Sequence, residues 1–155
     1  MNVELYEKLW MWGASALLLM FLSAIFVTAG MYAVHPPSHV ETVDPESLAT
    51  SPEFSNPAVT VRPDGSVMVT VVAQLFSFSP DPIEVPADRP VTFRLTSADV
   101  IHGFQIVGTN ANTMVVPGYV SQFTTVFDEP GDYLIVCNEY CGVGHHTMSG
   151  RIIVE

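Results

Sequence analysis

The chain has 155 residues, of which 48% are hydrophobic and only 14% are charged. Its mean hydropathy of +0.35 is too high for an ordinary soluble domain, in which about 25% of residues are charged. Five basic residues against sixteen acidic ones give a net charge of −11, which excludes nucleic acid as a partner because phosphate binding needs Lys and Arg. The length predicts one globular domain, and two cysteines are too few for a disulfide-stapled protein, although they could form one bridge.

A long apolar segment lies near the N-terminus. Residues 9–34 contain no Asp, Glu, Lys, Arg or His, and a helix of this length spans roughly 39 Å, enough to cross a bilayer. Trp10, Trp12 and Tyr32 lie near its ends, where aromatic side chains prefer the membrane interface. The alternative is a cleaved signal peptide, whose apolar region is about 7–15 residues long and follows a positive leader. Residues 1–8 instead carry two acids and one Lys, so we predict a retained transmembrane anchor.

The orientation of this anchor is predicted from the basic residues on either side of it. Lys8 precedes the apolar segment, and the first basic residue after it is Arg62. The positive-inside rule therefore favours a cytoplasmic N-terminus, residues 1–8, with the C-terminal part on the outer face of the cell membrane.

The rest of the chain divides into an expected linker and an expected β domain. Residues 35–59 hold five prolines among polar residues, a composition typical of an extended, semi-rigid linker. Residues 60–155 consist of short Val-rich runs separated by Pro, Gly and Asp turn signals, which predict an all-β sandwich or barrel. The expected strands occupy residues 66–76, 91–97, 101–107, 119–127, 131–137 and 150–154. Residues 35–155 carry fourteen acids, four Arg and no Lys, which predicts a solvated acidic surface.

A cluster of metal-binding residue types lies near the C-terminus. The segment CNEYCGVGHHTM, residues 137–148, has the spacing C-x3-C-x3-H-x2-M. Cys and Met are soft ligands and imidazole is borderline, a combination that suits copper. The spacing leaves two alternatives open: a disulfide between Cys137 and Cys141, or a zinc site, although zinc sites do not need Met.

The number of candidate ligands indicates which kind of copper site is present. A blue-copper site uses one Cys, two His and a weak Met, so the second Cys is one too many. Two thiolates can instead bridge two copper ions, each of which needs one more strong ligand. His145 supplies one, and we expect His102, in SADVIHGF, to supply the other, although a lone His in an apolar strand is more often simply packed there. His146 would point elsewhere, and the linker residues His35 and His39 are incidental.

These segments and the single anchor resemble subunit II of haem–copper oxidases. The resemblance extends over nearly the whole chain, and it implies a cupredoxin-like Greek-key domain carrying the binuclear copper centre CuA. A-type members have two transmembrane helices in this subunit, whereas this chain has room for one, so it resembles the B-type branch. The stretches PDPIEVP, residues 80–86, and YEK, residues 6–8, are also similar to B-type subunits.

The resemblance also implies a role for each ligand. Cys137 and Cys141 would bridge the two coppers, and His102 and His145 would each bind one. Met148 would be a weak ligand through sulfur, and Glu139 another through its backbone carbonyl. Relatives that oxidise quinols lack these ligands, so the electron donor is expected to be a small metalloprotein, either cytochrome c or a blue-copper protein.

The implied function is a redox subunit that accepts electrons outside the membrane and passes them to haem in a separate catalytic subunit I, which reduces O2. Electrons are expected to arrive near Phe76 and Phe78, although both could equally be core residues. A membrane-anchored copper carrier or assembly protein is the alternative. Nitrous oxide reductase also has a CuA domain, but 155 residues cannot hold its second domain.

Two acidic residues are assigned further roles by the resemblance. The Glu139 side chain would point toward the catalytic subunit, where A-type relatives bind Mg²⁺ with a Glu at this position, or it would pair with an Arg of that subunit. Glu7, just before the apolar segment, matches a B-type Glu at the mouth of the proton path. An ordinary acid at a helix N-terminus, stabilised by the helix dipole, is the alternative for Glu7.

Overall fold

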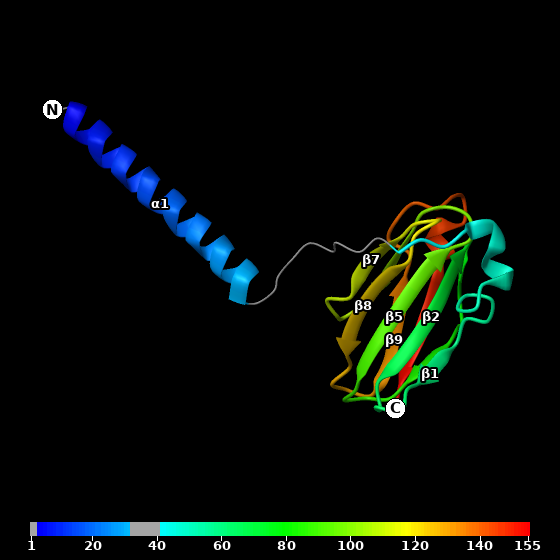
Figure 1. Cartoon of the computed structure of the whole chain (residues 1–155). Coiled ribbons are helices and arrows are strands. Elements are labelled where there is room, and N and C mark those ends of the chain that lie inside the picture. Colours follow the sequence, from blue (N-terminus) through cyan, green and yellow to red (C-terminus); the bar gives the residue numbers. More distant parts are fainter. Residues whose placement is uncertain (1–2, 32–40) are drawn as a thin grey trace. The chain divides into compact units, whose positions relative to one another are not determined.

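The computed structural model describes residues 3–31 and 41–155, which belong to two compact units, Met1–His39 and Val40–Glu155 (Figure 1). The first unit contains helix α1 (Val3–Met31), and the second contains the β domain. Each unit is described by itself.

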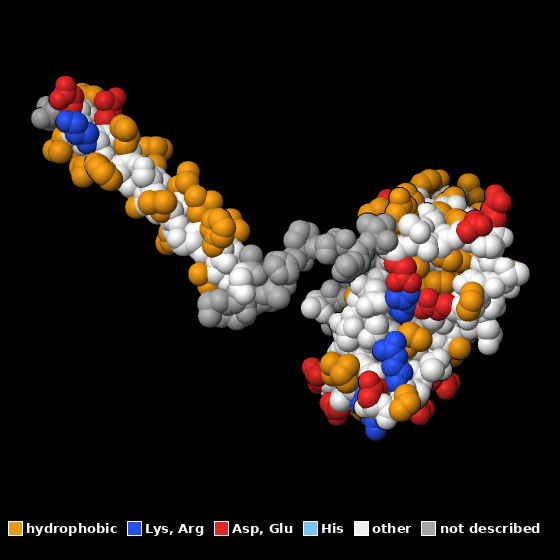
Figure 2. All heavy atoms as spheres, in the orientation of Figure 1, with side chains coloured by type: hydrophobic (Ala, Val, Ile, Leu, Met, Phe, Trp, Pro, Cys, Tyr) orange, Lys and Arg blue, Asp and Glu red, His pale blue; other side chains and the backbone are white. Residues whose placement is uncertain are grey.

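Helix α1 has 29 residues and is long and apolar enough to cross a membrane. Its hydrophobic side chains are exposed along the helix, while Glu4, Glu7 and Lys8 gather at its N-terminal end (Figure 2). An apolar surface on all sides is typical of a helix that lies in lipid. The helix begins six residues before the predicted segment 9–34, and Tyr32 and the end of that segment lie outside the described residues.

Most of the expected linker, residues 41–58, packs onto the β domain. We call residues 41–58 the strap. It contains the 3₁₀ helix η1 (Pro45–Thr50), whose first turn is capped by the Asp44 side chain accepting from the Glu46 N–H. Leu48 and Phe54 are buried against Val72. The structure therefore differs here from an extended linker, because these two apolar side chains hold the Pro-rich segment against the sheet.

The β domain is a sandwich of two five-stranded sheets. One sheet has the order β1-β2-β5-β8, with β3 paired to β2, and the other has the order β4-β10-β9-β6-β7. The first sheet consists of β1 (Val59–Val61), β2 (Val67–Gln74), β3 (Ser77–Ser79), β5 (Pro90–Ser97) and β8 (Ser121–Val126). The second consists of β4 (Ile83–Val85), β6 (His102–Ile106), β7 (Asn112–Val115), β9 (Gly131–Val136) and β10 (Ser149–Val154). The pairs β2–β5 and β4–β10 are parallel, and half of the strand pairs join strands that are not consecutive in the chain, so connections cross between the sheets.

This architecture confirms the predicted cupredoxin-like sandwich with one N-terminal helix. The six expected strands are present, with ends that shift by up to a few residues. The sequence analysis missed β1, β3, β4 and β7, which have three or four residues each. Such short runs are too brief to show the two-residue alternation that identifies a strand.

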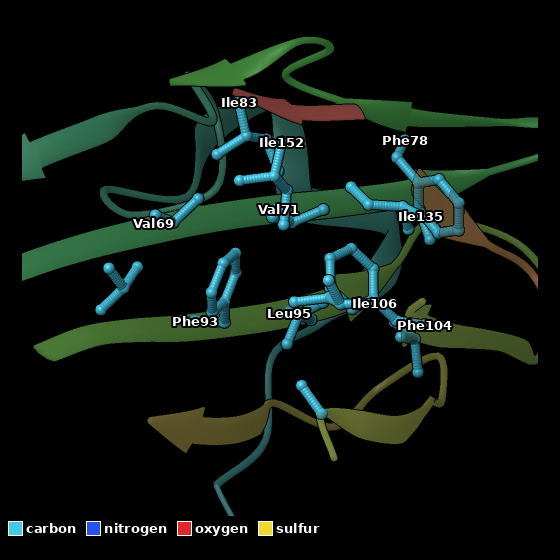
Figure 3. Packing of buried hydrophobic residues seen from close by; sticks show 14 of the residues in the cluster. Val69, Val71, Phe78, Ile83, Phe93, Leu95, Phe104, Ile106, Ile135 and Ile152 are labelled. Carbon is cyan, nitrogen blue, oxygen red and sulfur yellow. The ribbon is translucent and has the colours of Figure 1, made fainter. Parts of the chain in front are cut away.

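The core lies between the sheets and is rich in aromatic and β-branched side chains (Figure 3). Phe93 from β5 and Phe104 from β6 are fully buried and lie with ring centroids 5.8 Å apart. Phe78 meets the edge of Phe104 at 5.3 Å, and Phe123 stacks on Phe93 at 5.0 Å. This packing fixes β6 relative to the opposite sheet, and β6 begins with His102.

Replacing Phe104 by Ala should lower the free energy of unfolding by about 3–5 kcal/mol, because the cavity would remove contacts with three aromatic neighbours. Guanidinium denaturation followed by circular dichroism measures this change. Val126→Ala, at an exposed position of β8, should change stability by no more than about 0.5 kcal/mol. Equal effects of the two substitutions would contradict the assigned core.

Candidate metal centre

Three adjacent strands bring the predicted ligands to one end of the β domain. His102 is the first residue of β6, Cys137 follows the last residue of β9, and Met148 precedes the first residue of β10. The Cys137 N–H donates to the Met148 carbonyl at 3.2 Å, which closes the loop between β9 and β10. The loop ends are therefore held as rigidly as the strands from which they emerge.

The donor atoms at this end of the domain form two Cys–His pairs. The Cys137 sulfur lies 4.0 Å from His102 Nδ1, and the Cys141 sulfur lies 3.7 Å from His145 Nδ1. The two sulfurs are 3.8 Å apart and both cysteines are free, so the disulfide alternative is not the one in this structure. The His102, Cys137 and Cys141 donor atoms all lie within 4.8 Å of one another.

Two weaker donors complete the group, one beside each cysteine. The Glu139 carbonyl oxygen lies 3.1 Å from the Cys137 sulfur, and the Met148 sulfur lies 3.6 Å from the Cys141 sulfur. Two thiols, two imidazoles, a thioether and a carbonyl exceed the four ligands of a tetrahedral zinc site. Soft thiol and thioether donors combined with imidazoles match copper.

Burial differs between the two imidazoles. His102 has no exposed surface, and Cys137, Cys141 and Met148 are also buried. His145 is only half-buried, and the exposed ring of Tyr140 meets it with centroids 5.8 Å apart. The centre is therefore enclosed by the protein on the His102 side and approached from solvent on the His145 side.

The fold favours the protonated form of the Cys141 thiol. Burial, followed by the hydrogen bond and charge of neighbouring Cys137, raises the pKa of Cys141 to about 11. Thiolates are the form that binds metal, so binding must release protons and becomes tighter as the pH rises.

Asp99, which the sequence analysis did not single out, orients His102. One Asp99 carboxylate oxygen lies 2.8 Å from His102 Nε2, and the other accepts from the Leu75 N–H at 2.7 Å. The carboxylate keeps the proton on Nε2 and leaves Nδ1 free to face Cys137. Burial alone would raise the pKa of Asp99, but the hydrogen bonds from His102, Leu75 and Val100 outweigh it and hold the pKa below its usual range. In the sequence, the feature that could have indicated this role is that Asp99 lies three residues before His102.

The structure separates the two aromatic residues that were predicted to receive electrons. Phe78 is buried in the core against Phe104. Phe76 is half-buried and lies against the ligand loop, because a Cβ on Gly144 would meet the Phe76 ring at 2.6 Å. Only Phe76 therefore lies beside the metal centre.

A second close approach brings the loop to the strand that carries His102. A Cβ on Gly103 would meet the Asn138 side-chain oxygen at 1.9 Å and the backbone nitrogens of Asn138 and Glu139 at 2.9 Å. The Asn138 amide in turn donates to the Asn112 side chain at 3.1 Å. Gly103 thus lets the loop approach β6, a role that only the structure reveals.

The remaining predicted residues are placed as follows. The Glu139 side chain and His146 are exposed, and Glu7 is exposed on helix α1. His35 and His39 lie outside the described residues. Hydrophobic side chains around the loop are exposed as well, with Val143 at 88% and Tyr140 at 74% (Figure 2). The ring of Tyr140 meets that of His145, so an apolar side chain borders the exposed side of the centre.

Comparison with known proteins identifies relatives of the whole chain. The sequence model of the protein family "cytochrome c oxidase subunit II, periplasmic domain" matches residues 66–155. A cytochrome c oxidase subunit 2 of Thermus thermophilus is 41% identical over 154 residues, which cover 97% of this chain and 92% of the relative. A chain in a cryo-EM structure of a heme-copper terminal oxidase dimer has 34% identity and a TM-score of 0.69, covering 96% of this chain and 99% of that one.

A more distant structure shares the fold. The periplasmic domain of subunit II of Bradyrhizobium japonicum cytochrome oxidase has 17% identity and a TM-score of 0.54, covering 64% of this chain and 87% of that one.

Replacing Asp99 by Ala should weaken metal binding by about 10- to 100-fold, because His102 loses the partner that fixes its ring. Chelator competition measures the affinity, and the exposed Asp128→Ala is the matched control. Because the pKa of Asp99 is lowered, its contribution is present above the usual carboxyl range and disappears only as the pH falls through its folded value. Wild-type affinity in Asp99→Ala would refute the orienting role.

Replacing Gly103 by Ala should lower the free energy of unfolding by about 1–3 kcal/mol and impair metal binding, because the loop backbone must move away from β6. Thermal unfolding and metal stoichiometry report the two effects. Gly131→Ala is the control, since its Cβ would meet nothing closer than the Tyr133 ring at 3.9 Å. Normal metal binding by Gly103→Ala would contradict the close approach.

Proposed function

This chain belongs to the cytochrome c oxidase subunit II family, and we propose that it is the electron-accepting subunit of a membrane-bound terminal oxidase. The observation that carries the proposal is the convergence of two Cys–His pairs at one end of the sandwich. The oxidase is an oxidoreductase, and this chain contributes a redox site to it, while O2 reduction and proton pumping belong to the haem-containing subunit I.

The cofactor in this proposal is the binuclear copper centre CuA. Cys137 and Cys141 hold both copper ions, and His102 and His145 each hold one. Met148 and the Glu139 carbonyl are the weak ligands. What supports this assignment is the pairing of each sulfur with one imidazole and one weaker donor. When bound, the copper pair supplies one-electron transfer at a fixed geometry.

The residues around the centre favour fast electron transfer because the fold holds them in place. Asp99 holds the His102 ring, Gly103 allows the loop to rest on β6, and Phe76 packs over Gly144. A frame fixed in this way leaves the ligands almost in place when the charge of the centre changes. The buried cysteines and His102 also argue against the alternative of a copper carrier, because a carrier must expose its ligands to exchange metal.

The partners follow from the surfaces of the chain. Helix α1 anchors the subunit in the lipid bilayer as a single pass, with the N-terminus cytoplasmic and the β domain on the outer face. The acidic domain attracts a basic cytochrome c or a blue-copper protein over a distance of about 8 Å at physiological salt. The apolar surface at Tyr140 and Val143, beside His145, supports close contact once a partner arrives.

Two acidic side chains extend the proposal. Glu139 is exposed, so its carboxylate is free to meet subunit I, where it binds Mg²⁺ or pairs with an Arg. Glu7 lies in the second turn of α1, outside the apolar part, and takes up protons from the cytoplasmic side. Slower O2 consumption by Glu7→Gln with unchanged electron transfer into copper is the result that supports its role.

Replacing Cys141 by Ser should abolish the binuclear centre, because a hydroxyl cannot replace the bridging thiolate. Metal analysis and EPR of the full-length protein measure the copper stoichiometry and the mixed-valence signal. Met148→Leu is the matched control in the same loop: it should retain both coppers and shift the reduction potential, because the axial bond is weak. Two coppers with a mixed-valence signal in Cys141→Ser would overturn the assignment.

A further inference from the structure

The strap covers part of the outer face of the sheet, at Val72 of β2 and Arg94 of β5, and Arg94 holds the strap at two points. Arg94 lies in the middle of β5, and its side chain is only 14% exposed. Its guanidinium binds Glu41 at the start of the strap at 2.5 Å. It also binds both carboxylate oxygens of Glu53, beyond η1, and Gln122 of β8 at 2.7 Å.

The strap contacts this face through both charged and apolar side chains. Leu48, which lies between Glu41 and Glu53 in the chain, and Phe54, which follows Glu53, cover Val72 of β2. The hydrogen bonds to Glu53 and Glu41 raise the pKa of Arg94, and the bond from Arg94 lowers the pKa of Glu41. Arg94 and Glu41 therefore both stay charged at neutral pH. A guanidinium satisfies several carboxylate oxygens in one plane, which an ammonium cannot do.

The strap begins at the end of the domain that carries the metal centre. The Val43 N–H donates to the Gly118 carbonyl, and the Val120 N–H donates to the Glu41 carbonyl. Residues 117–120 follow β7, and Val115 of β7 is paired with His102 of β6. Figure 1 shows the cyan strap starting at the end of the sandwich where the orange ligand loop lies.

We propose that Arg94 is a positioning residue that clamps the strap, so that the chain from helix α1 is attached at Glu41 beside the copper-bearing end of the domain. The inference rests on the proposed function, in which copper passes electrons to a membrane subunit. With the clamp closed, residues 32–40 connect the helix to the domain. With the strap released, residues 32–58 connect them, a chain three times as long.

The clamp matters because transfer within a complex depends on effective concentration. Effective concentration falls roughly as the −3/2 power of the length of the connecting chain, so a threefold longer chain lowers it about fivefold. A centre whose ligands are unchanged would then deliver electrons more slowly.

The test uses the assembled, full-length oxidase with Arg94→Met, which keeps a long apolar stem and removes every donor. Hydrogen exchange of residues 41–58 should become at least about tenfold faster, while exchange in β9 and β10 stays unchanged. The optical and EPR spectra of the copper centre should match the wild type. Electron transfer from photoreduced copper to haem should slow about fivefold.

Two further variants separate the clamp from general stability. Arg151→Met removes an equal charge and an exposed pair with Asp132 on the other sheet, and it should leave exchange and transfer unchanged. A Gly/Ser insertion after His39, as long as residues 41–58, should slow the transfer as Arg94→Met does while leaving the strap protected.

Two outcomes with Arg94→Met would contradict the proposal. Unchanged exchange of the strap in Arg94→Met would overturn the clamp, and a released strap with wild-type transfer would overturn the positioning role. Glu41→Gln combined with Glu53→Gln removes the same contacts from the other side and should reproduce the Arg94→Met result. A wild-type oxidase that binds no copper, or whose copper does not reduce haem, would instead overturn the proposed function.

Discussion

The metal centre depends on the pairing of β9 with both β6 and β10. Ser149 lies opposite Val136 in one pairing, and Gln105 lies opposite Val136 in the other. Extending these registers brings Met148 next to Cys137 and brings the start of β6, with His102, alongside the first residues of the ligand loop. A slip of one residue in either pairing would turn His102 or Cys137 toward the other face of the sheet. The aromatic core between the sheets prevents such a slip, because it fixes Phe104 two residues from His102.

The sulfur-containing side chains of the site are held by the packing of the core. The cysteines and Met148 belong to the hydrophobic core cluster, so they are packed as apolar residues. Burial raises the pKa of Cys141 and keeps its thiol protonated. Asp99 provides the only charge that contacts His102 among the described residues, and it fixes the ring before metal arrives. The core packing and the Asp99 contact thus hold the donor atoms near one another.

Much of this could be predicted from the sequence, and the exceptions have physical causes. The long Val-rich strands and the C-x3-C-x3-H-x2-M spacing are local patterns, so they were found. Gly103 acts through contacts with Asn138 and Glu139, and Asp99 is held by Leu75, so both depend on residues distant in the chain that no periodicity marks. The composition of residues 35–59 indicated a linker because prolines and acids outnumber apolar residues there. Leu48 and Phe54 are enough to bury the segment, since Val72 offers them an apolar site on the outer face of β2.

The distribution of charge separates two tasks that the domain must perform. Fourteen acids and four Arg in residues 35–155 give a negative field that acts over about a Debye length and would attract a positively charged partner. Arg94 takes no part in that field at short range, because Glu41 and Glu53 neutralise it on the covered face of the sheet. The surface next to His145 is formed instead by Tyr140 and Val143, which carry no charge. Attraction over distance and contact at the metal centre therefore use different residues, so the contact need not be tight for the approach to be fast.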